Sequence, residues 1–447
     1  MYPYIPHTEE DKKAMLEFLG LDSVDELFAD IPEDVTSKDG LDLEPAKSEL
    51  EVSKYLNELA GKNRTINDMT CFLGAGAYDH YIPSIIDHII SRGEFFTSYT
   101  PYQSEASQGT LRYLFEYQTL IADLTGMDIS NASLYDEGVA IAEAALMATS
   151  VARKKEILIS KTVKPDARKV LNRYAYVQDL KVIEIDMEDG VTDLEDLENK
   201  MSDDVGAVII QSPNFFGAIE DIEKTADITH KVKRAGLITS VDPISLGILK
   251  RPGDLGADIV VGEGQSLGVP LAFGGPYLGF MAANKKYMRK MPGRIVGETE
   301  DEDGKRSYVL TLSTREQHIR RERATSNITS NQGLNTLIAT IYLVTLGKKG
   351  LREVALQSTK KAHYAMKKLT ESGKYKPLFD QPFFKEFALT SDNNADEILD
   401  GLKDEDILGG YHLGRDYSQF EDAILYAVTE KRTKDEIDKL SSVLEGI

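Results

Sequence analysis

The stretch that decides the fold is LITSVDPISLGILKRPGDLGADIVVGEGQSLG, residues 237–268. It holds two short apolar runs, LITSV and ADIVV, and each is followed directly by a polar or glycine-rich turn. Similar runs come before it, EILIS at 156, VIEID at 182 and VGAVIIQ at 205, and helical segments such as PDARKVLNRYA separate them. Apolar strands that alternate with helices predict an α/β fold with a mostly parallel central sheet, covered by helices on both faces.

The sequence before this region is helical in pattern. TEEDKKAMLEFLG places Thr8 before an acidic first turn and ends at a glycine, as a capped helix does, and DSVDELFADIP repeats the arrangement. Residues 104–126 carry apolar side chains at three-four spacing, which predicts a long amphipathic helix with Ser104 as its candidate N-cap.

After about Leu334 the pattern changes again. Two long helical segments lead into the shorter strands FKEFALT and ILYAVTE and into a final helix from Thr433. We therefore divide the chain into an N-terminal helical segment (1–65), a large α/β domain (66–333) and a small C-terminal α+β domain (334–447).

Composition excludes several classes of function. A net charge of -22 over 447 residues argues against nucleic acid and anionic membranes as partners, since both select basic surfaces. The lone Cys71 excludes an internal disulfide and a cysteine-built zinc site, and the seven histidines form no helical pair beside a carboxylate, so we expect no metal. The start lacks the features of a signal peptide and no apolar run is long enough to span a membrane, so we expect a cytoplasmic location.

Two glycine-rich or polar turns resemble phosphate sites but fit them poorly. FLGAGAYDH offers Gly74 and Gly76 without a preceding strand or a third glycine, so a tight turn is the better interpretation. NASLYDEG opens an alanine-rich helix, but Asp136 and Glu137 stand at its positive end, where they would repel a phosphate and stabilise the helix. We therefore expect a helix cap there.

Asp242 is a candidate ligand residue because it directly follows the LITSV run, at the edge where open α/β sheets bind ligands. A carboxylate at that place either caps the next helix or pairs with a ligand cation such as the protonated pyridine nitrogen of pyridoxal phosphate. The sequence leaves both open. The next turn, GEGQSLGVPLAFGGP at 262–276, has the composition of an active-site loop but holds no lysine, histidine or cysteine.

YTPYQSEASQG, at 99–109, places two tyrosines, two glutamines and Glu105 just before the long helix. Tyrosines with adaptable polar neighbours suit a binding wall or a subunit interface, whereas a capped helix entry is the structural alternative.

Several long motifs, in order along nearly the whole chain, resemble the glycine cleavage system P-proteins, and among them the first subunit of two-subunit glycine decarboxylases. They are YIPHTEED, TPYQSEASQGTLRYLFEYQTLIADLTGM, NASLYDEG, VDPISLGILKRPGDLGADIVVGEGQSLG, FGGPYLGF, MPGRIVGE and REQHIRRERATSNITSNQGL. The resemblance implies a fold-type-I pyridoxal phosphate architecture with a seven-stranded sheet. It also implies a reaction in which glycine loses carbon dioxide and its aminomethyl group passes to the lipoyl arm of the H-protein.

The chain departs from an active member of that fold. Gln265 and Ser266 occupy the region of the Schiff-base lysine, and no lysine lies between Lys250 and Lys285. The ring-stacking position holds Glu137 or a neighbour instead of a histidine. The resemblance therefore implies a half without covalent cofactor and with a vestigial Asp242. Pyridoxal phosphate is expected on a lysine-bearing partner, subunit 2, in a hetero-oligomer of two subunit types.

The residues carried over from the resemblance are few. The candidate wall toward the partner's cofactor or the lipoyl tunnel is Tyr99, Tyr102, Glu105 and Gln108, and the candidate interface residues are Arg320, Arg321 and Arg323, a basic run that suits a carboxylate. Solvated surface charges and fold-stabilising contacts are the alternative for each. At the level of the whole chain, a non-catalytic scaffold and an independent pyridoxal enzyme with an unusual base are the competing hypotheses.

Overall fold

The computed structural model describes residues 4–36 and 40–447, and the chain divides into two units, Met1–Arg64 and Thr65–Ile447. The first unit contains α1 (Glu9–Leu19), α2 (Glu49–Ala60) and two 3-10 turns. Thr8 caps α1 and Gly20 ends it in the left-handed region, with φ 71°, so the first predicted helix is confirmed. DSVDELF forms a 3-10 turn at Val24–Phe28 and no α-helix. No described residue of this unit is buried.

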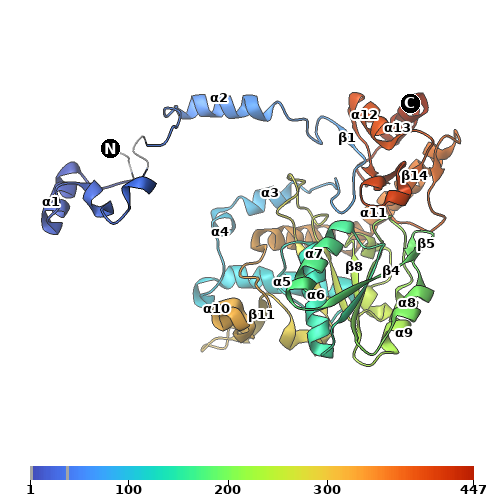
Figure 1. The fold of residues 1–447 in the computed structure, drawn as a ribbon, viewed down its shortest axis with the longest axis horizontal. Coiled ribbons are helices and arrows are strands. Elements are labelled where there is room, and N and C mark those ends of the chain that lie inside the picture. Colours follow the sequence, from blue (N-terminus) through green and yellow to red (C-terminus); the bar gives the residue numbers. More distant parts are fainter. Residues whose placement is uncertain (1–3, 37–39) are drawn as a thin grey trace. The chain divides into compact units, whose positions relative to one another are not determined.

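A seven-stranded sheet forms the centre of the larger unit (Figure 1). Neighbouring strands are parallel except at the strand that begins at Gly279, which runs antiparallel to both of its neighbours. All five runs that predicted strands lie in this sheet, so the mostly parallel sheet is confirmed. The strand order is β2 (Ile129–Ser130), β10 (Gly279–Ala283), β9 (Ile259–Glu263), β8 (Gly236–Val241), β7 (Val205–Gln211), β3 (Glu156–Ser160) and β4 (Lys181–Ile185).

Helices cover both faces of this sheet because alternate residues of each strand point to opposite sides. The helices are α6 (Glu137–Ala152) and α7 (Pro165–Val177) on one face, and α5 (Gln108–Thr125), α8 (Leu194–Lys200), α9 (Ile222–His230) and α11 (Gly333–Thr370) on the other. Ile157 and Ile159 of β3 pack into the core under α6 and α7. Leu158, between them, packs into the core on the opposite face of the sheet.

The C-terminal part adds a four-stranded antiparallel sheet and two further helices. The label α11 covers two helices that meet at a kink at Gly347, where φ is 57° and ψ is -174°, so the two predicted helical patterns are confirmed. Thr433 caps the last helix, as predicted. The boundary placed after residue 333 stays a prediction. The elements are β13 (Lys376–Pro377), β14 (Glu386–Thr390), β17 (Ala423–Ala427), β16 (Tyr411–His412), α12 (Ala395–Asp404) and α13 (Lys434–Gly446).

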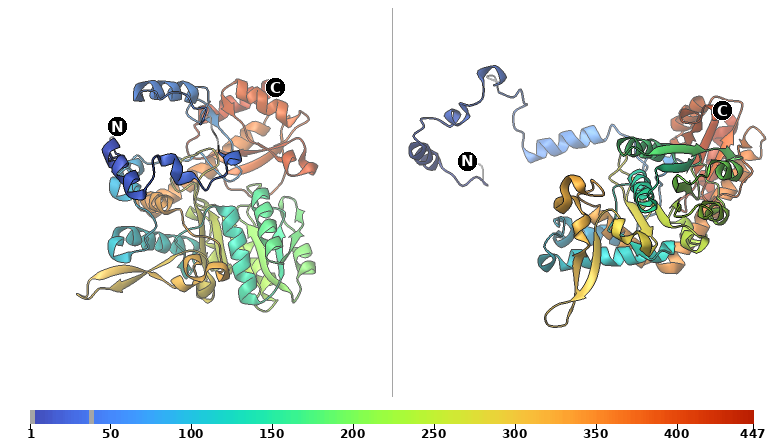
Figure 2. Two further views of the ribbon diagram at one scale, coloured as in Figure 1. Left: turned by 60° about the vertical axis from the view of Figure 1, so that its left-hand side comes forward. Right: turned by 60° about the horizontal axis from the view of Figure 1, so that its bottom comes forward.

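The predicted start of the long helix is wrong. Ser104 opens a separate 3-10 turn, Ser104–Ala106, and α5 begins at Gln108 after Ser107. The remaining elements are short, apart from a hairpin, β11–β12, that projects from the body in Figure 2. They are α3 (Ile85–Ile90), α4 (Gly93–Phe96), α10 (Gln317–Arg320), β11 (Ile295–Glu300), β12 (Arg306–Thr311) and the pairs β1 (Thr70–Cys71) with β15 (Ile407–Leu408) and β5 (Met187–Glu188) with β6 (Val191–Thr192). Among the described residues, no helix is both long and apolar enough to cross a membrane.

Candidate functional site

The carboxyl ends of the parallel strands gather the polar residues that the sequence singled out. Asp242 follows β8, Gln265 and Ser266 follow β9, and Glu137 opens α6 after β2. Gln265 and Ser266 are each 2% exposed, and Glu137 is 5% exposed. Open α/β sheets bind ligands at this edge, so this is where the predicted cofactor features are tested.

Asp242 uses both carboxylate oxygens within the chain. Its Oδ1 accepts a hydrogen bond of 3.0 Å from the backbone N–H of Ile244, and Ser266 Oγ lies 3.5 Å from the same oxygen. Its Oδ2 lies 2.7 Å from Nζ of Lys385, whose side chain is 2% exposed. Asp242 thus caps a turn, which is one of the two alternatives that the sequence left open, and the cation that it faces in this structure is the chain's own lysine.

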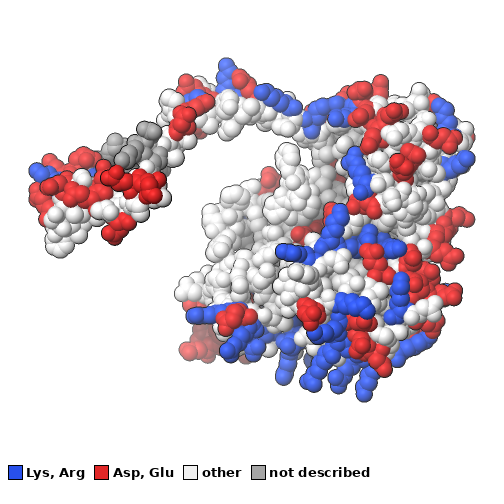
Figure 3. All heavy atoms as spheres, viewed as in Figure 1, with Lys and Arg blue, Asp and Glu red and all other residues white. Residues whose placement is uncertain are grey.

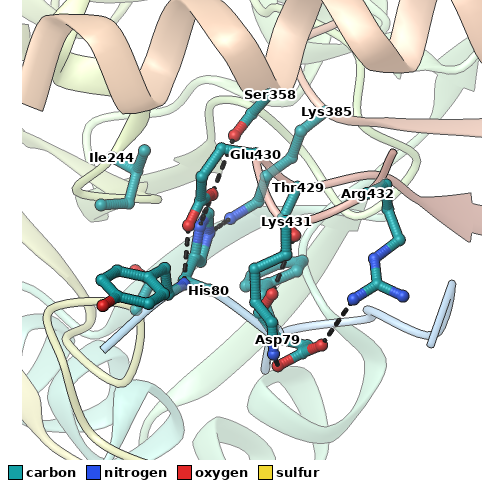
Figure 4. A network of polar contacts seen from close by, with 12 residues as sticks. Asp79, His80, Ile244, Ser358, Lys385, Thr429, Glu430, Lys431 and Arg432 are labelled. Carbon is teal, nitrogen blue, oxygen red and sulfur yellow. Dashed lines mark hydrogen bonds and ion pairs between the residues drawn. The ribbon is translucent and has the colours of Figure 1, made fainter. Parts of the chain in front are cut away.

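Lys385 reaches this edge from the C-terminal part, where it directly precedes β14. Its Nζ lies 3.4 Å from the centroid of the Tyr78 ring and 2.9 Å from Nε2 of His80. On the other side of the imidazole, Nδ1 of His80 lies 2.6 Å from Oε2 of Glu430. Figure 4 shows Lys385, His80 and Glu430 in a row, joined by these contacts.

The contacts of His80 assign its proton. A lysine ammonium only donates, so Nε2 of His80 accepts from Lys385 and the ring proton lies on Nδ1, where it is donated to Glu430. Burial acts to raise the pKa of Glu430, but the hydrogen bonds from His80 and from the backbone N–H of Tyr81 outweigh it and lower the pKa to about 2. The row therefore runs from Asp242 through Lys385 and His80 to the carboxylate of Glu430.

A second carboxyl group lies next to Lys385 in the chain. Glu386 accepts hydrogen bonds of 2.7 Å from Tyr78 Oη and 2.7 Å from the backbone N–H of Ala75. Burial raises the pKa of Glu386 to about 7, against the effect of these donors. Tyr78 thus contacts both residues of the Lys385–Glu386 pair.

Asp79, next to Tyr78, is tied to the same C-terminal segment. Its Oδ1 lies 2.5 Å from Nζ of Lys431 and its Oδ2 lies 3.1 Å from Arg432, while Thr429 Oγ1 donates to its backbone carbonyl at 2.8 Å (Figure 4). Together with Glu430, these residues hold segment 78–81 against the C-terminal part.

Gln265, which lies in the region predicted for the Schiff-base lysine, bonds to the backbone of two other residues. Its side-chain amide accepts from the backbone N–H of Tyr78 at 2.8 Å and donates to the carbonyls of Tyr78 and Val269 at 3.1 and 2.8 Å. These bonds engage both ends of the amide, so Gln265 anchors the backbone that carries the Tyr78 ring.

The start of α6 is closed by carboxylates, as the predicted cap requires. Asp136 caps the helix through a backbone N–H of the first turn. Oε2 of Glu263 accepts from the backbone N–H of Glu137 at 3.3 Å, and Oε1 of Glu137 accepts from Ser240 Oγ at 2.6 Å. Burial raises the pKa of Glu263 to about 7. Lys164 Nζ lies 3.9 Å from Glu137, and a Cβ at Gly76 would collide with this ammonium.

These contacts do not fit a pyridoxal phosphate bound to this chain. The carboxylate that would face the ring nitrogen is paired with Lys385. The helix start that would face the phosphate already donates to Glu263 and carries Asp136 and Glu137. The region of the Schiff-base lysine holds Gln265 and Ser266. All three sets of groups that a pyridoxal phosphate site needs are therefore engaged or missing.

The candidate wall residues lie away from this network. Tyr99 is 82% and Tyr102 51% exposed, and Glu105 is also exposed. The Tyr102 ring lies 5.3 Å from the Arg294 guanidinium, which is otherwise buried and pairs with Glu316 at 3.6 Å. One face of the exposed Tyr102 ring thus packs against the buried Arg294 guanidinium.

Gln108 differs from the other wall candidates. Its side-chain amide donates to the carbonyl of Tyr308 and accepts from the N–H of the same residue, both at 2.8 Å, and it also donates to the carbonyl of Ser104. These contacts join the start of α5 to strand β12.

The surface around α3 and α4 combines exposed apolar side chains with the exposed charges of Asp87, Arg92 and Glu94. Figure 3 shows mainly uncharged residues on the visible face of these helices and Lys and Arg toward the lower edge of the same view. Large exposed apolar side chains occur here in close succession along the chain: Tyr81, Ile85, Phe96, Tyr99 and Tyr102. Patches of this kind mark contact sites with other proteins.

The predicted basic run lies on the surface. Arg320 ends α10, and Arg321 and Arg323 belong to the 3-10 turn that follows. All three are exposed. Arg321 also lines a groove of about 400 Å³ between α6, α7 and segment 317–327, together with Glu143 and Arg173.

Sequence reasoning missed the residues that pair with Asp242 and close the network: Tyr78, His80, Lys385, Glu386 and Glu430. One signal was present. In FFKEFALT two adjacent charged residues interrupt an apolar strand pattern, and charged side chains in such a place are buried only when they are paired.

The model of the family described as glycine cleavage system P-protein matches residues 2–444 of the chain. A protein of Carboxydothermus hydrogenoformans named "Probable glycine dehydrogenase (decarboxylating) subunit 1" is 54% identical over 443 residues, which are 99% of each chain. A crystal structure of glycine decarboxylase (P-protein) of the glycine cleavage system, in inhibitor-bound form, superposes with a TM-score of 0.92 at 41% identity and 99% coverage of both chains.

More distant structures bear on the fold alone. One is a C-DES variant with glycine covalently linked to the PLP cofactor, with a TM-score of 0.62 at 13% identity over 85% of this chain and 97% of that one. The predicted architecture, that of fold-type-I pyridoxal phosphate enzymes, is confirmed by these likenesses.

Proposed function

Because the chain belongs to the glycine cleavage system P-protein family, we propose that it is one of the two subunits of a glycine decarboxylase. With a lysine-bearing second subunit it decarboxylates glycine and passes the aminomethyl group to the lipoyl arm of the H-protein. Pyridoxal phosphate, which supplies the electron sink for decarboxylation, is carried by that partner. The reaction takes place in the cytoplasm in a hetero-oligomer of two subunit types.

One observation supports the inference that the cofactor is bound by the second subunit and not by this chain. The edge of the sheet that would hold the cofactor has no lysine in the loop after β9, and its Asp242 is paired with Lys385. A Schiff-base lysine is needed for rapid exchange of amino groups, so decarboxylation requires a second chain.

The exposed apolar side chains of α3 and α4, Ile85 and Phe96, support a contact with that chain at this surface. Tyr99, Tyr102 and Glu105 stand exposed beside it, and Arg294 holds the Tyr102 ring in one orientation. We assign these three residues to the wall of the partner's active site. Gln108 joins this proposal as a positioning residue, since its contacts to β12 orient the segment that bears the wall. Arg320, Arg321 and Arg323 are proposed to pair with carboxylates across the interface.

The test is exchange of labelled bicarbonate with the carboxyl group of glycine in the presence of lipoylated H-protein. We expect neither subunit to catalyse exchange alone and the mixture to do so. Exchange by this chain alone would overturn the proposal.

The wall is tested in the reconstituted complex. Tyr102→Ala and Glu105→Ala should each lower exchange at least tenfold, while Tyr176→Ala, a control at an exposed tyrosine on α7, should not. If both wall variants assemble and turn over like the wild type, the assignment is wrong and a scaffold role gains support.

A further inference from the structure

We propose that Asp242, Tyr78 and His80 form a site for a primary ammonium group and that Lys385 fills this site from within the chain. Lys385 thereby takes the place of the cation that a bound cofactor would otherwise present to Asp242. The inference concerns the isolated chain and does not rest on the reaction of the complex.

The geometry is that of an ammonium receptor. Three groups lie around Nζ of Lys385: the Asp242 carboxylate, which forms an ion pair at 2.7 Å, Nε2 of His80 at 2.9 Å, and the face of the Tyr78 ring with its centroid at 3.4 Å. A carboxylate, an imidazole acceptor and an aromatic face thus surround one cation, whose side chain is 2% exposed.

Each wall of this site is itself held in place. Gln265 fixes the backbone of Tyr78, Glu386 accepts from the Tyr78 hydroxyl, and Glu430 fixes the ring of His80. Asp242 is oriented by the backbone N–H of Ile244. Since none of these supports involves the lysine, the walls should keep their arrangement when the Lys385 side chain is shortened.

The start of α6, at the same edge of the sheet, is likewise occupied by a side chain of this chain. The first N–H of α6 donates to Glu263 at 3.3 Å, so an internal carboxylate occupies a helix start that could otherwise bind a phosphate. The chain thus satisfies both a cation site and an anion site with its own side chains.

The experiment truncates the lysine and replaces the lost atoms. Lys385→Ala removes three carbons and the nitrogen, which correspond to n-propylammonium. We expect the variant to melt roughly 5 °C or more below the wild type, because Asp242 is left as a buried unpaired carboxylate. Addition of n-propylammonium should restore much of this loss, whereas neutral 1-propanol at the same concentration should not.

A matched control separates a specific site from a general effect of amines. Lys200→Ala removes the same atoms from a partly exposed pair, in which Nζ lies 2.6 Å from Asp196. Its melting temperature should not respond to n-propylammonium. Equal responses of Lys385→Ala, Lys200→Ala and the wild type would overturn the proposal.

Two further measurements keep the test decisive. If Lys385→Ala fails to fold, Lys385→Met should still be less stable than the double variant Asp242→Asn/Lys385→Met, because the double variant buries no unpaired charge. The opposite order would contradict the proposal. Borohydride reduction with pyridoxal phosphate, followed by mass spectrometry, should leave the wild-type Lys385 unmodified, and a pyridoxyl adduct there would show that the lysine serves a cofactor.

Discussion

Stability should depend on pH through Glu143, a buried carboxyl group outside the proposed site. Glu143 lies on α6, is 3% exposed, and accepts one hydrogen bond of 2.7 Å from Ser326 Oγ. Burial raises its pKa from 4.5 to about 7 despite that bond. The native state therefore holds a proton on this group in a range where the unfolded chain has lost it.

The sign follows from proton linkage. Between the unfolded and the folded pKa the native state binds more protons, so stability falls as the pH rises through this window and levels off above the folded value. For pKa values of 4.5 and about 7, the contribution of Glu143 changes by about 1.3 kcal/mol between pH 6 and pH 8. Lower pH values are less useful because the chain approaches its pI of about 4.9.

The perturbation is Glu143→Gln, which keeps a carbonyl oxygen for Ser326 and removes the ionisable group. Urea denaturation at pH 6 and pH 8 measures the difference in free energy of unfolding between variant and wild type. That difference should move in favour of the variant by about 1.3 kcal/mol from pH 6 to pH 8. Glu322→Gln, at an exposed glutamate of the same groove, is the control and should show no such change. A difference for Glu143→Gln that stays constant with pH would refute the reasoning.

Three further predictions rest on single contacts. Asp136→Ala removes the cap of α6 and should lower the free energy of unfolding by about 1 kcal/mol, whereas Asp136→Asn should cost less than half of that, as urea denaturation can check. Phe273→Ser should change the stability of the isolated chain by less than about 0.5 kcal/mol, since the Phe273 side chain is 102% exposed; a larger loss would mean that it has a partner within the chain. Ser266→Lys should not give glycine–bicarbonate exchange by the isolated chain, because Asp242 stays paired with Lys385, and exchange by this variant alone would contradict that account.

The parts of the fold that could be predicted depend on local signals. The capped helix after Thr8, the cap at Thr433 and the five strands of the central sheet all follow from residue types within one or two turns of chain. Ser104 shows the limit of such signals. Ser104 and Ser107 are both cap-type residues ahead of the same apolar pattern, but Ser107 makes no side-chain cap bond, and Gln108, the first residue of α5, bonds to Tyr308 of β12, 200 residues away.

The candidate site was predicted only in part, for a related reason. Asp242, Gln265 and Ser266 were found because each follows a recognisable strand. Their partners come from outside the strand pattern: Tyr78 and Glu386, which contact each other, are separated by 308 residues. The adjacent Lys385 and Glu386 in FFKEFALT indicate that these charges have partners, but no local sequence pattern identifies the partner residues.

The ion pair with Lys385 changes the interpretation of Asp242 as a cofactor ligand. A carboxylate at this edge of a fold-type-I sheet invites the inference of a bound pyridine ring. A buried carboxylate and a buried ammonium, however, each need the other, because removing one partner leaves a charge whose burial costs several kcal/mol. Lys385 is held by Asp242 and by His80, and His80 is held by Glu430, so Asp242 has a structural reason to be present without any cofactor. A vestigial aspartate would tolerate replacement by alanine, whereas this one should not.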